Sequence, residues 1–430
     1  MPPPNGTKGP GFGPRLVLFL TVFIHLLGFG LLLPVLPYYA KEYGASGFLV
    51  GLLSTSFSFS QFLFAPVWGR LSDRLGRRPI LLGSLVLTSA SYVVFGLAHS
   101  LPLLFISRIV AGIAGATLPT AQTYMADVTS PEERTKGMGM IGAALGLGFT
   151  FGPAIGGALS HYGYSVPAFA SAGLALVAAV LAYFLLPESL SPESRAAAAE
   201  ARRHRPGLGH QFRDAFALPS VRAVLLLYFL ATVCFSGLEA TFALFGFDRY
   251  GLKASNVGYL LAYMGILAVI MQGGLVGRLA RRFGEPALVR AGFILLGAGM
   301  IAAGTAPPFS WLLLTLAAVA LGNGLASPSL AGLVSIATTA AAQGSTLGVY
   351  QALGSLARTF GPSLGGLAFD QIGPTSPLWL GGIILVVDGN IHAIGGAIGV
   401  TFADKKSVDW HYVYDPRTDA WTTRRPMPTG

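Results

Sequence analysis

Three ionisable residues interrupt long apolar segments of the chain. Glu239 lies in FSGLEATFALF (235–245), Arg108 in FISRIVAGI (105–113) and His25 in FIHLLGFG (23–30). A carboxyl group or an imidazole in such a setting can carry a proton, and charged groups in apolar spans are rare and mostly functional. We therefore expect proton exchange at Glu239, with His25 as a second candidate. Either side chain could instead be a structural hydrogen-bonding group, and Arg108 could extend its charge to a membrane surface.

The composition explains why these segments are apolar. Hydrophobic residues make up 53% of the chain and charged residues 11%, and the mean hydropathy is +0.63. A soluble domain has roughly 25% charged residues, so an integral membrane protein is expected. Cys234 is the only cysteine, which excludes disulfides and thiolate metal clusters. We expect no metal and no cofactor, and without a nucleotide loop or a nucleophile arrangement we expect no enzyme.

The apolar runs have the length of membrane spans. A span needs about 20 residues to cross ~30 Å of hydrocarbon. Six runs precede a polar stretch at 188–220 and five follow it. They lie at 15–38, 47–68, 80–98, 101–125, 137–160 and 164–187, and then at 221–245, 255–278, 286–305, 309–332 and 344–368. This pattern predicts an all-α membrane protein.

The basic residues predict the orientation. If the N-terminus is cytoplasmic, most Lys and Arg residues fall in inside loops, and the outside loops hold only Lys41, Arg249 and Lys253. This asymmetry follows the positive-inside rule. The net charge of +10 is therefore a topology signal, and the partner we expect is a lipid bilayer rather than nucleic acid.

The sequence before the polar stretch resembles the sequence after it. TFGPAIGG (150–157) matches TFGPSLGG (359–366), and WGRLSDRLGRRP (68–79) matches VGRLARRFGEPA (276–287), at an offset of about 209 residues. Parallel repeats of six helices, with a binding site between them at mid-membrane, are a known transporter architecture.

The loop GRLSDRLGRRPILL (69–82) carries two glycines, an aspartate and four arginines within ten residues. It resembles the signature loop of the major facilitator superfamily at Gly69, Asp73, Arg74, Gly76, Arg77 and Arg78. The resemblance implies that Asp73 faces a helix N-terminus of the opposite half and helps to hold the outward-open state, which a helix dipole would favour. It also implies a role for Arg108 in proton coupling.

Two further segments resemble exporters within that family. GAALGLGFTFGPAIGG (142–157) is similar to the antiporter motif at Gly148, Gly152, Pro153, Gly156 and Gly157. The first span is similar to those of tetracycline and multidrug exporters, although these usually carry an Asp where this chain has His25. Close helix packing alone could also explain the glycines.

Other polar or aromatic residues in the spans are candidates for lining a substrate cavity. They are Gln61, Gln122, Phe242, Gln272, Asn323, Gln351 and Arg358. Some of them could instead hold helices together through hydrogen bonds.

The sequence changes character after the eleventh run. Only PLWLGGIILVV (377–387) is left of an expected twelfth span, and about 17 Å of helix covers half a bilayer. The residues that follow resemble one truncated kelch repeat, with strands expected at 388–396, 413–416 and 420–428. Alternatively, 378–403 crosses the membrane and buries Asp388, which would cost about 2.5–3.5 kcal/mol. Either a natural fusion or a truncation of the chain would explain this change of character.

The resemblance implies a major facilitator fold with an N-terminal half at 1–187, a cytoplasmic linker at 188–220 and a C-terminal half at 221–387, in which the twelfth helix is incomplete. The kelch-like tail would follow at 388–430. We expect a monomer in the plasma membrane that exports small amphipathic or aromatic compounds in exchange for protons. Two alternatives are uptake of a sugar or small metabolite, and a non-transporting chimera that binds through its tail.

Overall fold

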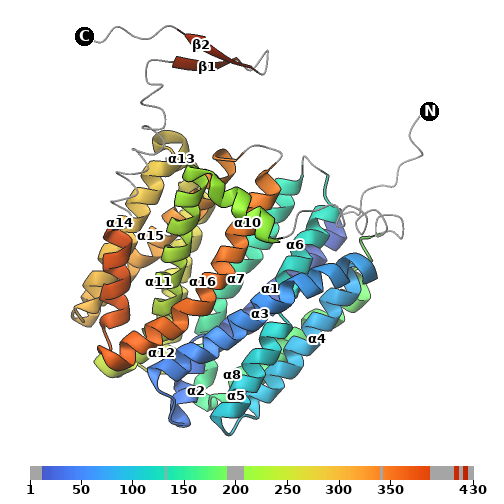
Figure 1. The fold of residues 1–430 in the computed structure, drawn as a ribbon. Coiled ribbons are helices and arrows are strands. Elements are labelled where there is room, and N and C mark those ends of the chain that lie inside the picture. Colours follow the sequence, from blue (N-terminus) through green and yellow to red (C-terminus); the bar gives the residue numbers. More distant parts are fainter. Residues whose placement is uncertain are drawn as a thin grey trace.

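The computed structural model describes residues 12–130, 133–190, 208–338 and 342–387, and two strands near the C-terminus. The four long segments are almost entirely helical (Figure 1). Before the linker the helices are α1 (Phe12–Leu32), α2 (Leu36–Glu42), α3 (Gly47–Leu75), α4 (Arg77–Gly96), α5 (Leu101–Ile113), α6 (Thr117–Asp127), α7 (Arg134–Leu159) and α8 (Ser165–Leu185). After it are α10 (Leu208–Ala217), α11 (Pro219–Tyr250), α12 (Ala254–Ile270), η2 (Met271–Leu275), α13 (Val276–Phe283), α14 (Glu285–Gly304), α15 (Phe309–Ile336) and α16 (Gln343–Gln371).

The helices account for every run predicted before residue 368. Some runs are broken into two helices: α1 and α2 separate at Leu33–Val35, around Pro34, and α5 and α6 separate at Ala114–Ala116. The run predicted at 255–278 continues through a π-helical turn, η2, to Phe283. Large apolar side chains face outward, with Leu63 55% exposed, Trp311 62% and Phe184 75%. Such a surface belongs in lipid rather than in water.

Ten helices in the described part of the chain are long and apolar enough to cross a membrane. Helix α16, the predicted eleventh span, is not among them, although its 29 residues would reach across a bilayer. Its many Gly, Ser and Gln residues lower its hydropathy. Because α16 packs between α3 and α11, small residues such as Gly361, Gly365 and Gly366 lie in helix contacts. The short helix Ser376–Val387 occupies the place of the incomplete twelfth span.

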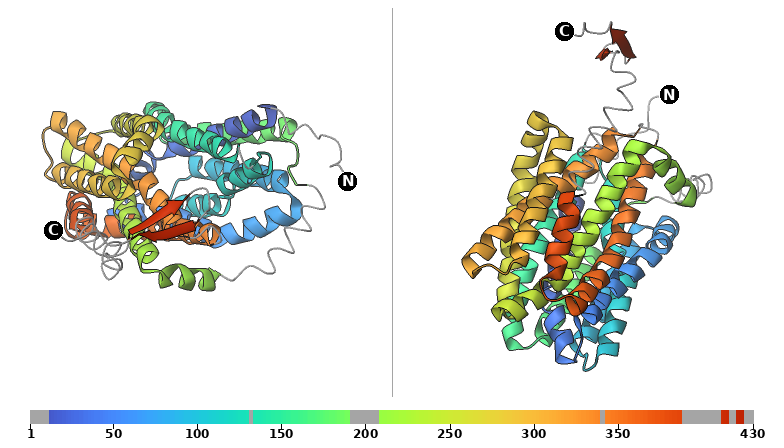
Figure 2. Two further views of the ribbon diagram at one scale, coloured as in Figure 1. Left: turned by 90° about the horizontal axis from the view of Figure 1, so that it is seen from above. Right: turned by 60° about the vertical axis from the view of Figure 1, so that its left-hand side comes forward.

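Packing follows the same pattern in the two repeats. Before the linker α7 packs against α1, and after it α16 packs against α11. Each of these helices also contacts the other repeat, since α7 packs against α12 and α16 packs against α3. In both views of Figure 2 most helices of the two repeats lie on opposite sides of the bundle.

The glycines of the repeated TFGP motif allow these close contacts. A Cβ atom on Gly152 of α7 would lie 2.7 Å from the Cα atom of Gly30 in α1, and one on Gly156 would overlap the carbonyl of Leu31. The equivalent Gly365 of α16 would meet the carbonyl of Gly237 in α11 at 2.8 Å. Small residues at helix crossings let backbones approach to a distance that side chains prevent.

Matching glycines also turn the chain between spans. Gly76 joins α3 to α4 with φ 110°, and Gly284 joins α13 to α14 with φ 76°. Residues with a Cβ atom rarely adopt this backbone region. The signature loop and its counterpart therefore share a turn, although the second copy has Ala280-Arg281 in place of Ser72-Asp73.

The tail contains β1 (His411–Asp415) and β2 (Ala420–Arg424), paired antiparallel with Tyr414 opposite Trp421. They overlap the strands predicted at 413–416 and 420–428, whereas the strand predicted at 388–396 lies outside the described residues. A kelch blade has four strands and needs neighbouring blades. One hairpin does not show a kelch repeat, which stays a prediction.

Replacing Gly156 by Ala tests the close packing of α7 on α1. We expect a stability loss of about 1–3 kcal/mol, because the added methyl group meets the backbone of Leu31. Thermal unfolding of the protein in detergent measures this loss as a lower midpoint. Gly142→Ala is the matched control on the same helix, since a Cβ atom there has nothing within 4 Å. Equal midpoints for both variants would contradict the packing described here.

Candidate functional site

Glu239 and Arg358 are charged residues in the middle of long helices, on α11 and α16. Both side chains are exposed, although the flanking residues Leu238, Ala240, Ala357 and Thr359 are buried. Arg358 interacts electrostatically with Glu239. Within the described part of the chain neither side chain forms a hydrogen bond or an ion pair, so both are open to a ligand.

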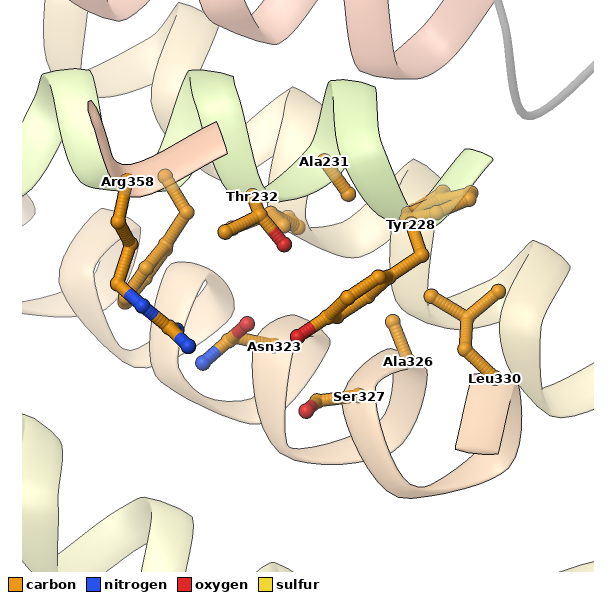
Figure 3. A pocket seen from close by; sticks show the side chains of 11 residues that line it. Tyr228, Ala231, Thr232, Asn323, Ala326, Ser327, Leu330 and Arg358 are labelled. Carbon is orange, nitrogen blue, oxygen red and sulfur yellow. The ribbon is translucent and has the colours of Figure 1, made fainter. Parts of the chain in front are cut away.

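A cavity of about 150 Å³ lies beside Arg358, between α11, α14, α15 and α16. We call it the Arg358 cavity. Its polar lining consists of Tyr228, Thr232, Asn323, Ser327 and Arg358, and the rest of the lining is Ala231, Phe235, Phe293, Leu296, Ala326 and Leu330. In Figure 3 the guanidinium of Arg358 and the hydroxyl of Tyr228 point toward Asn323 from different sides. Polar groups thus converge in a setting that is otherwise apolar, as in small-molecule sites.

The position of Tyr228 depends on α16. Its ring stacks on Tyr350 with centroids 3.7 Å apart, and a Cβ atom on Gly354 would overlap the Tyr228 hydroxyl. Gly354 therefore leaves the room that the phenol needs. Tyr228 lies in the apolar sequence LLLYFLA (225–231), so nothing in its local pattern identifies it as a cavity residue.

Of the predicted cavity residues, Asn323 and Arg358 line the Arg358 cavity. Gln61 donates a hydrogen bond to the carbonyl of Gly115 at 3.4 Å, and Trp68 donates to the carbonyl of Ile113, where α5 and α6 separate. These side chains satisfy carbonyls that the helix break leaves free. Phe242 is 3% exposed, lies near Phe245 and does not line the Arg358 cavity. The other candidates, Gln122, Gln272 and Gln351, are exposed.

Arg108 and His25 lie elsewhere, on helices before the linker. Arg108 is 4% exposed and its guanidinium lies 4.8 Å from the ring centroid of Phe95, on α4. Its charge is therefore held against an aromatic ring instead of extending to the surface. The Nε and Nη2 atoms of Arg108 and the Nδ1 atom of His25 are buried without a hydrogen-bond partner. The structure does not bring either residue to the Arg358 cavity, so that site is formed without them.

The residues of the signature loop form an ionic network. Arg77 is 7% exposed and pairs with Asp73 at 2.5 Å and with Asp127, at the end of α6, at 3.1 Å. Glu188 accepts hydrogen bonds from the backbone N–H groups of Arg77 and Arg78 at 2.9 and 3.2 Å. Its carboxylate thus caps the N-terminus of α4, where the helix dipole favours an anion. Gly69 and Arg74 belong to the last turns of α3, which lead into this network.

The two repeats are joined at the opposite end of the bundle, where α2 lies and α3 begins. Asp370 of α16 accepts hydrogen bonds from the backbone N–H groups of Gly47 and Phe48, both at 2.8 Å. The hydroxyl of Ser46 accepts a hydrogen bond from the backbone N–H of Leu49. The first turn of α3 is therefore capped partly by the residue that precedes it and partly by Asp370 of the other repeat. The sequence gives no sign of this contact, because Asp370 and Gly47 are 323 residues apart.

Two further contacts close the same end. Lys41 pairs with Asp248 at 3.5 Å, and its ammonium group lies 4.8 Å from the ring centroid of Phe247. The hydroxyl of Tyr38 donates to the carbonyl of Leu252 at 2.8 Å. We call the end that holds these contacts and the Asp370 cap the α2 end, and the opposite end the Asp73 end.

Comparison with known proteins shows the family. The model of the Major Facilitator Superfamily matches residues 18–362, with a second match over 274–391. Multidrug resistance protein 2 of Bacillus subtilis (strain 168) is 31% identical over 385 residues, which are 86% of this chain and 92% of that protein. The tetracycline resistance protein of class D from Salmonella ordonez is 31% identical over 378 residues, covering 86% of this chain and 94% of that protein.

Among solved structures, the human organic anion transporter MFSD10 (TETRAN) is similar with a TM-score of 0.67. It is 26% identical, and the match covers 89% of this chain and 99% of that one. Sequence and fold thus agree over nearly all the helices described above. The chain is a multi-pass membrane protein that belongs to the Major Facilitator Superfamily, a family of transporters and not of enzymes.

Proposed function

We propose that this protein exports small amphipathic or aromatic compounds across the plasma membrane in exchange for protons. The observation that carries the proposal is the pair of accessible, opposite charges at mid-helix, Glu239 and Arg358, beside a cavity with a polar lining. The names of the multidrug and tetracycline resistance proteins, each 31% identical to this chain over the matched residues, support efflux as the direction and drugs as the substrates.

The contacts between the repeats fit a transport cycle. In our proposal the N-terminus is cytoplasmic, so the α2 end faces outside, and the structure is closed there by Asp370, Lys41 and Tyr38. The opposite state would open the α2 end and close the Asp73 end. The role that the family resemblance implies for Asp73, facing a helix N-terminus across the interface, belongs to that second state.

The moving parts in this proposal are two halves, 1–187 and 221–387, joined by the linker 188–220, within a single monomer. The TFGP motif of α7 contacts α12, where Gly258 lies against the carbonyl of Pro153. The TFGP motif of α16 contacts α3, where Gly51 lies against the carbonyl of Pro362. These small-residue interfaces would be the surfaces on which the halves tilt.

Glu239 is the proposed proton carrier, with Arg108 and His25 as further candidates in the coupling. For the substrate we propose contact with the partly exposed rings of Phe29, Phe57 and Phe149. The ring centroids of Phe57 and Phe149 lie 5.4 and 5.8 Å from that of Phe29. Aromatic surfaces of this kind bind many amphipathic compounds without fixing one shape.

Replacing Glu239 by Gln tests the proposed proton carrier. We expect proton-driven efflux of a fluorescent amphipathic dye from proteoliposomes to fall by about tenfold or more, because the amide cannot exchange a proton. Glu42→Gln, at the exposed end of α2, is the matched control and should keep its rate. Wild-type efflux by the Glu239→Gln variant would refute this assignment.

Replacing Asp370 by Ala tests the closure of the α2 end. Loss of a helix cap costs about 1 kcal/mol, which would shift the two-state equilibrium by about fivefold toward an open α2 end. Spin labels at positions 42 and 249, in a Cys234→Ala background, report the distance across this end. We expect a larger long-distance population in the variant.

Asp214→Ala removes an exposed carboxylate from α10 and is the control for the change in charge. The proposed closure is wrong if Asp370→Ala leaves the distance distribution unchanged.

A further inference from the structure

The site presents an anion and a cation, Glu239 and Arg358, that form no hydrogen bond and no ion pair within the described part of the chain. Glu239 follows Phe235 by one helical turn on α11, and Phe235 lines the Arg358 cavity. Glu239 therefore lies next to the cavity that Arg358 enters. Within the protein, the charge of Glu239 and the charge of Arg358 compensate each other through their electrostatic interaction.

The lining offers further unused hydrogen-bonding groups. The side chains of Thr232, Asn323 and Ser327 form no hydrogen bond to any described residue, and all three line the cavity. Figure 3 shows them around the space that the Arg358 guanidinium enters. A planar guanidinium binds a carboxylate through two parallel hydrogen bonds, and hydroxyl and amide donors can complete the shell of such an anion.

The size of the cavity limits what it holds. Sites for whole drug-sized molecules have volumes of about 300–1,000 Å³, so about 150 Å³ takes a charged head group and little more. The remainder of a ligand must extend out of the cavity, and the exposed carboxylate of Glu239 lies one turn beyond Phe235.

The balance of charge selects among ligands. A purely anionic ligand at Arg358 would leave Glu239 without its cation, and a purely cationic ligand at Glu239 would leave Arg358 without its anion. An uncompensated charge within a membrane protein is costly. A molecule with both charges pairs with both residues, so the site favours it over either singly charged relative.

We propose that the substrates are zwitterionic amphipaths, with an anionic group such as a carboxylate in the Arg358 cavity and an ammonium group at Glu239. The inference rests on the proposed export function and names its substrate class. The ammonium group and a proton compete for the same Glu239 carboxylate, which is the exclusion that exchange of substrate for protons requires. Arg358 takes no part in that competition and selects the anionic group.

Three probes that share one aromatic body test the proposal by equilibrium binding to the purified full-length protein. They are an aryl amino acid, its methyl ester, which is only a cation, and its N-acetyl derivative, which is only an anion. We expect the zwitterion to bind about tenfold more tightly than either relative, the ratio expected for one charge-assisted hydrogen-bonded pair. Equal affinities of the ester and the zwitterion for the wild-type protein would overturn the proposal without any variant.

Variants then assign the two charges. Arg358→Gln should lower the affinity for the zwitterion without lowering that for the ester, because the ester then no longer leaves an uncompensated cation behind. Glu239→Gln should likewise lower the affinity for the zwitterion without lowering that for the N-acetyl derivative. Arg249→Gln, at the exposed end of α11, removes a positive charge elsewhere and should change none of the affinities. A loss of ester binding in Arg358→Gln equal to the loss of zwitterion binding would show a structural role for Arg358 and refute the assignment.

Efflux of the same probes separates this inference from the proposed function. Proton-driven export of ester and zwitterion at equal rates and affinities would leave the exporter standing and refute the zwitterion site. Selective binding of the zwitterion without proton-driven transport would refute the exporter and support the site.

Discussion

The close backbone contact of α7 and α16 with the helices on both sides is the constraint on which the rest of the structure depends. Each helix carries the sequence Thr-Phe-Gly-Pro-x-x-Gly-Gly, at 150–157 and 359–366. One face packs on a helix of its own repeat and the other on a helix of the opposite repeat. A side chain at Gly156 or Gly366 would meet backbone atoms of Leu31 or Gly47. The two repeats thus meet through surfaces of small residues, which can slide without unpacking large side chains.

Polar contacts join the two repeats at one end of these interfaces. At the α2 end, Asp370 reaches across to the first turn of α3, and Lys41 pairs with Asp248. At the Asp73 end, Arg77 is held by Asp73 and Asp127, which belong to its own repeat. Exposed ion pairs and helix caps each contribute about 1 kcal/mol or less. Contacts of this strength can be exchanged in the transport cycle proposed above.

The sequence predicted the parts of the fold that depend on local composition. The apolar runs, the loop that contains Gly76, and the repeated Gly-Pro motif are properties of short segments, and the helices begin and end near the predicted limits. The tolerance of α16 for polar residues was not predictable, because it comes from its position between α3 and α11.

The site was predictable only in part, for the same reason. Asn323 and Arg358 stood out as polar residues in spans, and they line one cavity. Tyr228 gave no signal, since its position is set by Gly354 and Tyr350 on another helix. Gln61 looked like a cavity residue, but it satisfies a carbonyl at a helix break that only the three-dimensional structure reveals. Asp370 acts on a helix 323 residues away, and such a contact has no local pattern.

The central claim is that substrate and proton compete for Glu239. The most direct measurement is the number of protons released when a zwitterionic amphipath binds to the purified protein in weakly buffered solution, followed with a pH indicator. At a pH at which Glu239 is protonated in the free protein, competition at one carboxylate predicts proton release on binding, up to one proton per bound molecule, and none from the Glu239→Gln variant. Proton uptake on binding, or release that persists in that variant, would contradict the claim.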